Sequence, residues 1–235
     1  MNPPTSFREE FYFPLPPRIS NGGIWYSDVI TLPMLQEAYW HGIFPWPDED
    51  ESAVIPWFFP KHRGVIPIAD FHIPHTVVRL MKKKLYEVRI DTAFEPVIHN
   101  CASRNDGEPT WITTAIIQAY LEFHQAGWAH SFEVWNRETG ALAGGLYGVS
   151  IGGVFAGESM FYRESGASKI ALAALGRTLS QCGVKLIDTQ MVTNVTSLFG
   201  AEYYPAAMYL RSLNQFRGEP LSTESLRTGL AANEI

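Results

Sequence analysis

The stretch from residue 110 to residue 189 constrains the fold most, because its hydrophobic pattern changes period several times in a fixed order. Between Thr110 and Gln125 apolar residues recur at the spacing of one helix face, and Gly127 suits the end of that helix. The predicted elements are a helix at 110–125, strands at 130–136, 141–149 and 153–157, a helix at 167–182 and an apolar strand at 184–189. This order predicts an α/β (α+β) fold with a mixed or mostly antiparallel sheet, and it is compatible with the acetyltransferase-like (GNAT) fold.

The chain before this stretch is less regular. Residues 1–30 are rich in proline, glycine and aromatic residues, which predicts irregular structure packed on the body of the protein. We expect a helix at 31–41, an exposed acidic loop at 48–51 and a loose polar tail from about Arg217. A change to a more regular pattern near residue 70 predicts a boundary there, between a small N-terminal domain at 1–70 and a larger domain at 71–235.

A basic cluster interrupts an acidic composition. The formal net charge is −6, which argues against tight, nonspecific binding of duplex nucleic acid. Five cations nevertheless fall between residues 79 and 89, on a short helix predicted at 76–84 and a strand at 86–90: Arg79, Lys82, Lys83, Lys84 and Arg89. They form either a solvated helix face or a local patch for phosphate groups.

Two cysteines, Cys101 and Cys182, lie far apart and outside any CxxC motif, which fits a reducing compartment. No secretory leader is recognised at the N-terminus, and no run of about 18 apolar residues predicts a membrane span. His72 and His75 are the only close histidine pair and lack a metal-ligand pattern. We therefore expect a cytoplasmic protein without a metal or membrane, and a monomer by default.

Polar side chains stand at the ends of two apolar strands. Glu158 follows the predicted strand 153–157, and Asp188 and Gln190 share one face of an extended segment because side chains alternate with period two. If the two strands are neighbours, the three side chains converge. The alternative is that they are ordinary polar residues at strand ends.

Eight short segments occur in a fixed order between roughly residues 35 and 210. They are Ala38-Tyr39-x-x-Gly42-Ile43-Phe44-Pro45-Trp46, Trp57-x-x-Pro60-x-x-Arg63, Thr110-Trp111-Ile112-Thr113, Gly127-x-Ala129-His130-Ser131-x-Glu133-Val134-Trp135, Gly144-Gly145-Leu146-Tyr147-Gly148-Val149, Gly157-Glu158-Ser159-Met160-Phe161, Ala167-Ser168-Lys169 and Leu186-Ile187-Asp188-Thr189-Gln190. Their order and spacing resemble the leucyl/phenylalanyl-tRNA–protein transferase family.

The resemblance implies the activity. An aminoacyl-tRNA would donate Leu, Phe or sometimes Met to the α-amine of a protein that begins with Arg or Lys, and the product would be routed to degradation. It also implies a small N-terminal domain on a GNAT-like domain, and no metal or organic cofactor. Because the tRNA ester is already activated, such an enzyme mainly aligns an amine with a carbonyl.

The resemblance also implies residue roles. Gln190 matches the position that contacts the attacking amine. Asp188 would polarise Gln190, and Glu158 would hold the cationic N-terminus of the acceptor. The apolar pocket for the donor side chain matches Leu146, Phe155, Gly157, Leu175, Leu179 and Ile187, which are otherwise plain core. Trp57 and Trp111 match positions that grip the terminal adenosine, and the basic cluster at Arg79, Lys82, Lys83 and Lys84 would meet acceptor-stem phosphates.

Departures from the family pattern bear on substrate choice. They fall at Gly166, Val195, Phe199, Ala206 and Ala207, where the pattern has Asn, His, Leu and a pair of Arg. Gly166 also makes 163–168 approximate the phosphate loop of acyl-CoA acetyltransferases. An acyl-CoA-dependent N-acetyltransferase and a non-catalytic relative that binds tRNA or degrons are therefore the alternatives.

Overall fold

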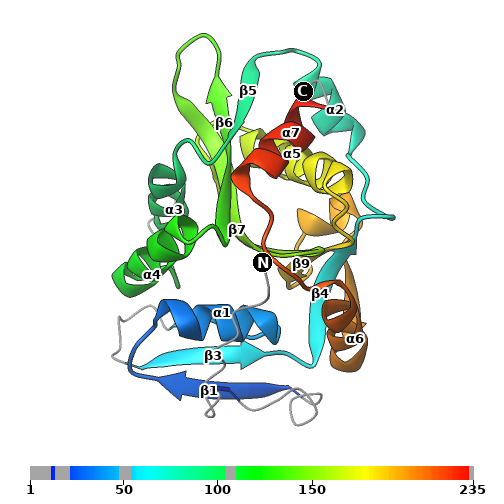
Figure 1. Ribbon diagram of the computed structural model, residues 1–235. Coiled ribbons are helices and arrows are strands. Elements are labelled where there is room, and N and C mark those ends of the chain that lie inside the picture. Colours follow the sequence, from blue (N-terminus) through cyan, green and yellow to red (C-terminus); the bar gives the residue numbers. More distant parts are fainter. Residues whose placement is uncertain (1–11, 14–21, 48–53, 104–109, 233–235) are drawn as a thin grey trace.

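The computed structural model describes residues 12–13, 22–47, 54–103 and 110–232, and it contains two sheets (Figure 1). The small sheet has the antiparallel order β1-β3-β2, with strands Gly23–Ser27, Ile55–Phe59 and Phe44–Pro45. Helix α1 (Leu32–Trp40) lies between this sheet and the rest of the protein. The acidic loop expected at 48–51 lies outside the described residues.

The large sheet has seven strands in the order β10-β4-β9-β8-β7-β6-β5. Its strands are β4 (His62–Pro67), β5 (Tyr86–Ile90), β6 (Ala129–Asn136), β7 (Leu142–Ile151), β8 (Val154–Tyr162), β9 (Leu186–Gln190) and β10 (Glu202–Pro205). Strands β8 and β9 run parallel, and the other neighbouring pairs are antiparallel. The mixed, mostly antiparallel sheet expected from the sequence is thus confirmed.

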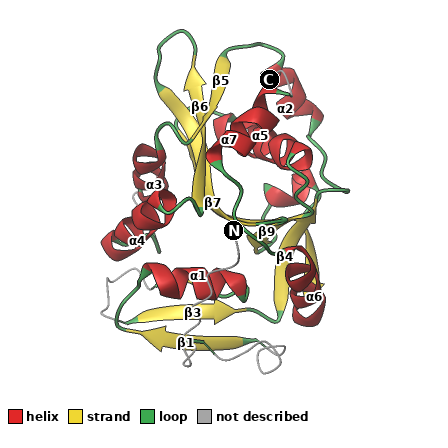
Figure 2. Cartoon of the chain, in the orientation of Figure 1, coloured by secondary structure: helices red, strands yellow, loops and turns green. Residues whose placement is uncertain are grey.

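Helices cover both faces of the large sheet (Figure 2). They are α2 (His75–Met81), α3 (Phe94–Ala102), α4 (Thr114–Gln125), α5 (Ala167–Gln181), α6 (Ala206–Phe216) and α7 (Thr223–Ala231), with a 3-10 turn η2 at Thr196–Phe199. One apolar core, which includes residues of α1, α3, α4 and α6, fills one face, and a second core around α5 fills the other. None of the helices in the described parts of the chain has the length and apolar character needed to cross a bilayer.

Local sequence signals explain the main helix boundaries. The side chain of Thr31 accepts a hydrogen bond from the Met34 amide and begins α1, and Thr113 does the same for Ile116 in α4. Helix α4 therefore starts at Thr114, later than the predicted 110, because Thr113 is its cap. Helix α5 matches the predicted 167–182 to within one residue at its end.

Three expectations were wrong. Part of 1–30 forms strand β1, because it pairs with β3. The polar tail contains α7, whose Leu226 is fully buried and whose Arg227 donates to the Ile90 carbonyl at 2.9 Å. The third is the end of the strand predicted at 153–157, which runs on to Tyr162 because its pairing with β7 resumes after a bulge and continues to Tyr162. The change from the small sheet to the large one falls between Phe59 and His62, ahead of residue 70.

Candidate active site

The central strands β8 and β9 separate at one end, and the polar residues lie at this separation. Their parallel pairing reaches only from Val154–Leu186 to Ala156–Asp188, although β8 continues to Tyr162 and β9 to Gln190. A bulge in β8 leaves Glu158 without a partner on β7, because Ser159 pairs with Tyr147 and Gly157 with Gly148. Glu158 therefore lies inside a strand, not just after one as expected. Glu158, Asp188 and Gln190 do lie together.

Asp188 is fully buried and its carboxylate is saturated. Arg63 donates to it twice, from Nε to Oδ1 and from Nη2 to Oδ2, each at 2.7 Å. The Tyr209 hydroxyl donates to Oδ2 at 2.7 Å and the Gln190 amide to Oδ1 at 2.9 Å. Burial alone would lower the pKa of Arg63. The adjacent Asp188 carboxylate outweighs this effect, and the pKa of Arg63 lies above its usual value. Asp188 thus holds the backbone of Gln190 and not its side chain.

Gln190 has an unusual backbone conformation that fixes its side chain. Its φ is +53°, in the left-handed region that a residue with a side chain rarely adopts. The neighbouring strand accommodates this turn because Gly64 lacks a Cβ, which would lie only 2.4 Å from the Met191 carbonyl carbon. Gln190 Nε2 donates to Glu158 Oε1 at 3.0 Å. Its Oε1 accepts no hydrogen bond from the described residues, so it is free to accept one from a substrate.

Glu158 is half-buried between this amide and two tyrosines. The Tyr120 hydroxyl donates to Glu158 Oε2 at 3.3 Å, and the Tyr39 hydroxyl is hydrogen-bonded to that of Tyr120. Burial raises the pKa of Glu158 to about 8; hydrogen bonding by the Tyr39 and Tyr120 hydroxyls opposes this shift, and the charge of Asp188 adds to it. A carboxyl group with such a pKa exchanges its proton near neutral pH.

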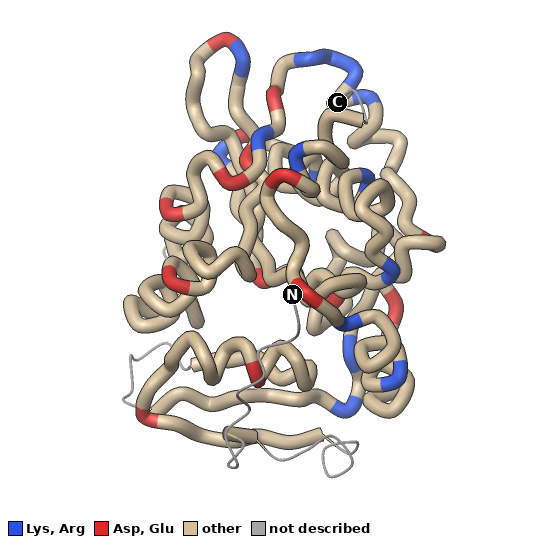
Figure 3. Tube along the Cα trace, viewed as in Figure 1, with Lys and Arg blue, Asp and Glu red and all other residues tan. Residues whose placement is uncertain are grey.

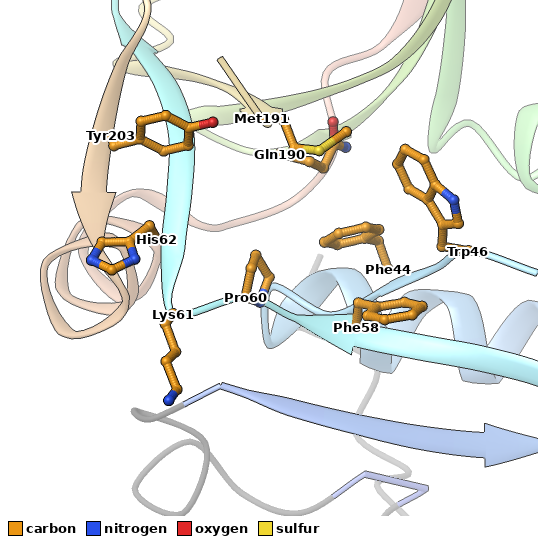
Figure 4. A pocket seen from close by; sticks show the side chains of 9 residues that line it. All are labelled: Phe44, Trp46, Phe58, Pro60, Lys61, His62, Gln190, Met191 and Tyr203. Carbon is orange, nitrogen blue, oxygen red and sulfur yellow. The ribbon is translucent and has the colours of Figure 1, made fainter. Parts of the chain in front are cut away.

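A cavity of about 710 Å³ opens at Gln190 (Figure 4). Its wall is largely aromatic and apolar, and it is lined by Phe44, Trp46, Phe58, Pro60, Lys61, His62, Gln190, Met191 and Tyr203. Figure 4 shows Phe44, Phe58 and Trp46 across the space from Gln190 and Met191. The Trp46 ring stacks on Trp111, with centroids 5.3 Å apart and planes at 21°. A planar, apolar group fits against this wall.

The two tryptophans singled out from the sequence lie in different surroundings. Trp111 is half-buried beside the cavity, through its contact with Trp46. Trp57 has no exposed surface, donates from Nε1 to Ser27 Oγ at 2.8 Å and packs its ring against Phe13. The stacking role expected of Trp57 is therefore corrected, because it offers no ring face to a ligand. Trp46 has the accessible position instead.

The apolar residues expected to hold a donor side chain form part of the second core. Five of them are at most 4% exposed: Leu146, Phe155, Leu175, Leu179 and Ile187. They lie in the core between the large sheet and α5. Gly157 lies above them at the separation of the strands, where a Cβ would meet only the Asp188 carbonyl, at 3.8 Å. A Cβ at Gly157 would therefore make only ordinary van der Waals contact.

The basic cluster lies near the beginning of α5, away from the first cavity. Figure 3 shows positive charge along α2 and the turn after it. Arg79 and Lys83 line a second cavity of about 420 Å³ together with Lys169 and Gly166, and Lys82 and Lys84 are exposed nearby. Gly166 has φ +87°, and a Cβ there would lie 2.6 Å from Leu80 Cδ2. The positive φ favours glycine at this position, which directly precedes the N-terminal end of α5, where anions are favoured.

Comparison with known proteins assigns the chain to a protein family. The mixed sheet and its bulged central strand define the class of fold, which the crystal structure of FemX shares at 11% identity, over 73% of this chain and 66% of FemX, with a TM-score of 0.50. The family model for leucyl/phenylalanyl-tRNA protein transferase matches residues 65–214. Proteins of that name from Oleidesulfovibrio alaskensis and Tolumonas auensis are 42% and 38% identical, over 91% and 94% of this chain and 88% and 94% of theirs. The chain belongs to this family of aminoacyltransferase enzymes.

Sequence reasoning missed several residues of the site. Arg63, Tyr209, Tyr39 and Tyr120 surround the three polar residues but lie on other elements, up to 125 residues away in the chain. Arg63 and Tyr39 belong to segments that carried the resemblance, which was the only available signal. No local pattern distinguishes such residues from ordinary core.

Proposed function

We propose that this enzyme transfers Leu or Phe, or another apolar residue that is unbranched at Cβ such as Met, from charged tRNA to proteins that begin with Arg or Lys. It would act as a cytoplasmic monomer, and its products would be marked for degradation. The supporting observation is the Gln190–Glu158 pair where β8 and β9 separate, because Gln190 of this pair also lines an aromatic cavity. Membership of the family supports the donor and the class of acceptor.

The three polar residues would have different roles toward the amine of the acceptor. An amide is too weak a base to take a proton, so Gln190 Oε1 would accept a hydrogen bond from the amine and orient it. Glu158, which accepts a hydrogen bond from Gln190 Nε2 at 3.0 Å, would hold the cationic N-terminus of the acceptor. Asp188 would act through the Gln190 backbone, because its own oxygens are occupied by Arg63, Tyr209 and the Gln190 amide. It is a positioning residue.

The donor would be held by three surfaces. The stacked Trp46–Trp111 pair offers a planar wall for the terminal adenosine. The donor side chain would enter at Gly157, above the core of Leu175 and its neighbours. Phosphates of the acceptor stem would meet Arg79, Lys83 and Lys169 around the second cavity, an interaction that depends on salt and not on base sequence.

A transfer assay tests this proposal. It offers tRNAs charged with Leu, Phe, Met, Val or Lys to peptides that differ only in their first residue, Arg, Lys, His or Ala. We expect product with Leu or Phe on peptides beginning with Arg or Lys. Acetyl-CoA serves as the competing donor. Acylation from acetyl-CoA, with no transfer from any charged tRNA, would refute the proposal, and binding of charged tRNA without product would indicate a non-catalytic relative.

A further inference from the structure

Two buried tyrosines form a hydrogen-bonded chain that ends on Glu158. Tyr39 comes from α1 and Tyr120 from α4, and both are at most 1% exposed. The Tyr39 hydroxyl bonds to that of Tyr120, which donates to Glu158 Oε2, and Gln190 Nε2 donates to Glu158 Oε1. Both carboxylate oxygens therefore have a donor, and the chain joins the small N-terminal part of the protein to the site.

A third tyrosine shows that this arrangement is not a simple consequence of packing. Tyr147 is also fully buried and packs edge-on against Tyr120, at 5.6 Å between ring centroids. Its hydroxyl has no hydrogen-bond partner among the described residues. Burying a hydroxyl is costly unless it is hydrogen-bonded. Packing in this cluster thus does not by itself supply a partner, whereas Tyr120 bonds to Glu158 and Tyr39 to Tyr120. Tyr147 also provides a matched control.

Glu158 differs from Asp188 in being free to change its charge. The buried charge of Arg63 is neutralised by Asp188, at 2.7 Å, and none of the described cations forms a salt bridge with Glu158. The titratable and charged groups that face Glu158 from neighbouring elements are Tyr39, Tyr120, Tyr147, Asp188, Arg63 and Tyr209. Of the two carboxylates in the site, only Glu158 lacks a permanent counter-charge.

We propose, on the basis of the function proposed above, that Glu158 takes the proton from the α-ammonium of the acceptor and that Tyr120, supported by Tyr39, stabilises its charged form. The ammonium would give one proton to the Glu158 carboxylate. The neutral amine would attack the ester carbonyl, so that a C–N bond forms and the bond from carbon to the ribose oxygen breaks. The second amine proton would go to that departing oxygen, and Glu158 would release its proton to water.

The energetics favour this assignment. An α-ammonium has a pKa of about 8, and burial raises the pKa of Glu158 to about 8. Transfer of the proton between two groups of similar pKa costs little free energy, which is the condition for an efficient general base. Gln190 has no atom basic enough to take this proton. Each oxygen of the Asp188 carboxylate already accepts two hydrogen bonds.

The test is the pH dependence of transfer from Leu-tRNA or Phe-tRNA to a peptide beginning with Arg. For the wild type, kcat/KM should pass through a maximum near pH 8, because it requires ionised Glu158 and the protonated peptide. In Glu158→Gln the maximum should become a rise to a plateau, since only peptide that is already neutral reacts. At saturating peptide and pH 7, kcat should fall by about 10²- to 10⁴-fold.

Two tyrosine variants assign the acidic limb of this profile. Tyr120→Phe removes a donor to the charged carboxylate, so the acidic limb should move to higher pH. Tyr147→Phe removes an unbonded hydroxyl from the same cluster and should leave the limb in place. A merely structural role of Tyr120 would alter stability without moving the limb.

Three results would overturn the inference. One is a Glu158→Gln enzyme with a raised KM for peptide and an unchanged kcat, which would mean that Glu158 only holds the cation. Another is an acidic limb that stays in place in Tyr120→Phe, and the third is one that moves equally in Tyr147→Phe. Failure of the wild type to use any charged tRNA is a separate result, because it would reject the proposed function itself.

Discussion

Asp188→Asn tests whether the buried ion pair with Arg63 supports the site. Both side chains are at most 1% exposed, and the new amide group cannot accept the bonds that Oδ2 receives from Arg63 Nη2 and the Tyr209 hydroxyl. The Arg63 cation would remain buried without a counter-charge. Removing one partner of such a pair costs about 3–5 kcal/mol. We therefore expect the free energy of unfolding to fall by that amount.

Urea unfolding followed by tryptophan fluorescence measures this change. With a slope of about 2 kcal/mol per M, the midpoint should fall by about 1.5–2.5 M. Tyr209→Phe removes one hydrogen bond to the carboxylate and should cost less, about 1.5–3 kcal/mol. The double variant Arg63→Met with Asp188→Leu should recover much of the loss, because neither buried charge is left alone.

The result that contradicts this reasoning is a small effect. If Asp188→Asn shifts the midpoint by less than about 0.5 M with an unchanged slope, the pair behaves like an exposed one. Additive losses in the double variant would likewise show that Arg63 and Asp188 are not coupled.

Further predictions concern the donor, its phosphates and pH. Trp46→Ala should weaken charged-tRNA binding by about 1–3 kcal/mol in a filter assay, whereas Trp57→Phe should lower stability and leave affinity unchanged; equal losses of affinity would count against the assignment. Lys169→Ala should reduce the slope of log affinity against log salt by about 1, and the exposed Lys185→Ala should not. Burial raises the pKa of Glu158 from 4.5 to about 8, so the folded protein binds this proton more tightly than the unfolded chain and loses stability as pH rises between these values. Glu158→Gln should therefore match the wild type at pH 4.5 and exceed it by about 1–3 kcal/mol at pH 8.5 in urea unfolding, after allowance for partial exposure.

The role of Asp188 illustrates how the structure sharpens a prediction. The sequence placed Asp188 and Gln190 on one face of a strand, which suggested contact between their side chains. The left-handed backbone at Gln190 turns its side chain toward Glu158 instead, and Asp188 is left with the Gln190 amide hydrogen. A strand register cannot anticipate this, because the turn depends on space provided by Gly64 on another strand.

Trp46 and Trp57 illustrate a second limit of prediction from the sequence. Trp46 and Trp57 both lie in aromatic, proline-containing segments, and nothing local separates them. Pairing in the small sheet decides the outcome, since Trp57 lies opposite Trp25 and is covered, while its neighbour Phe58 faces the cavity. Alternation of sides along β3 therefore removes Trp57 from the site and leaves Trp46 stacked on Trp111.

The sequence by itself determined the repeating local patterns: α1, α4, α5, the β6–β7 hairpin and the positions of Glu158, Asp188 and Gln190 at two strands. These follow from hydrophobic periodicity and caps, which act over a few residues. Only the tertiary structure decided which groups these residues meet. Arg63 reaches Asp188 across 125 residues and Tyr39 reaches Tyr120 across 81. The docking of α7 has the same origin, because its polar sequence becomes ordered through Leu226 and Arg227 against distant elements.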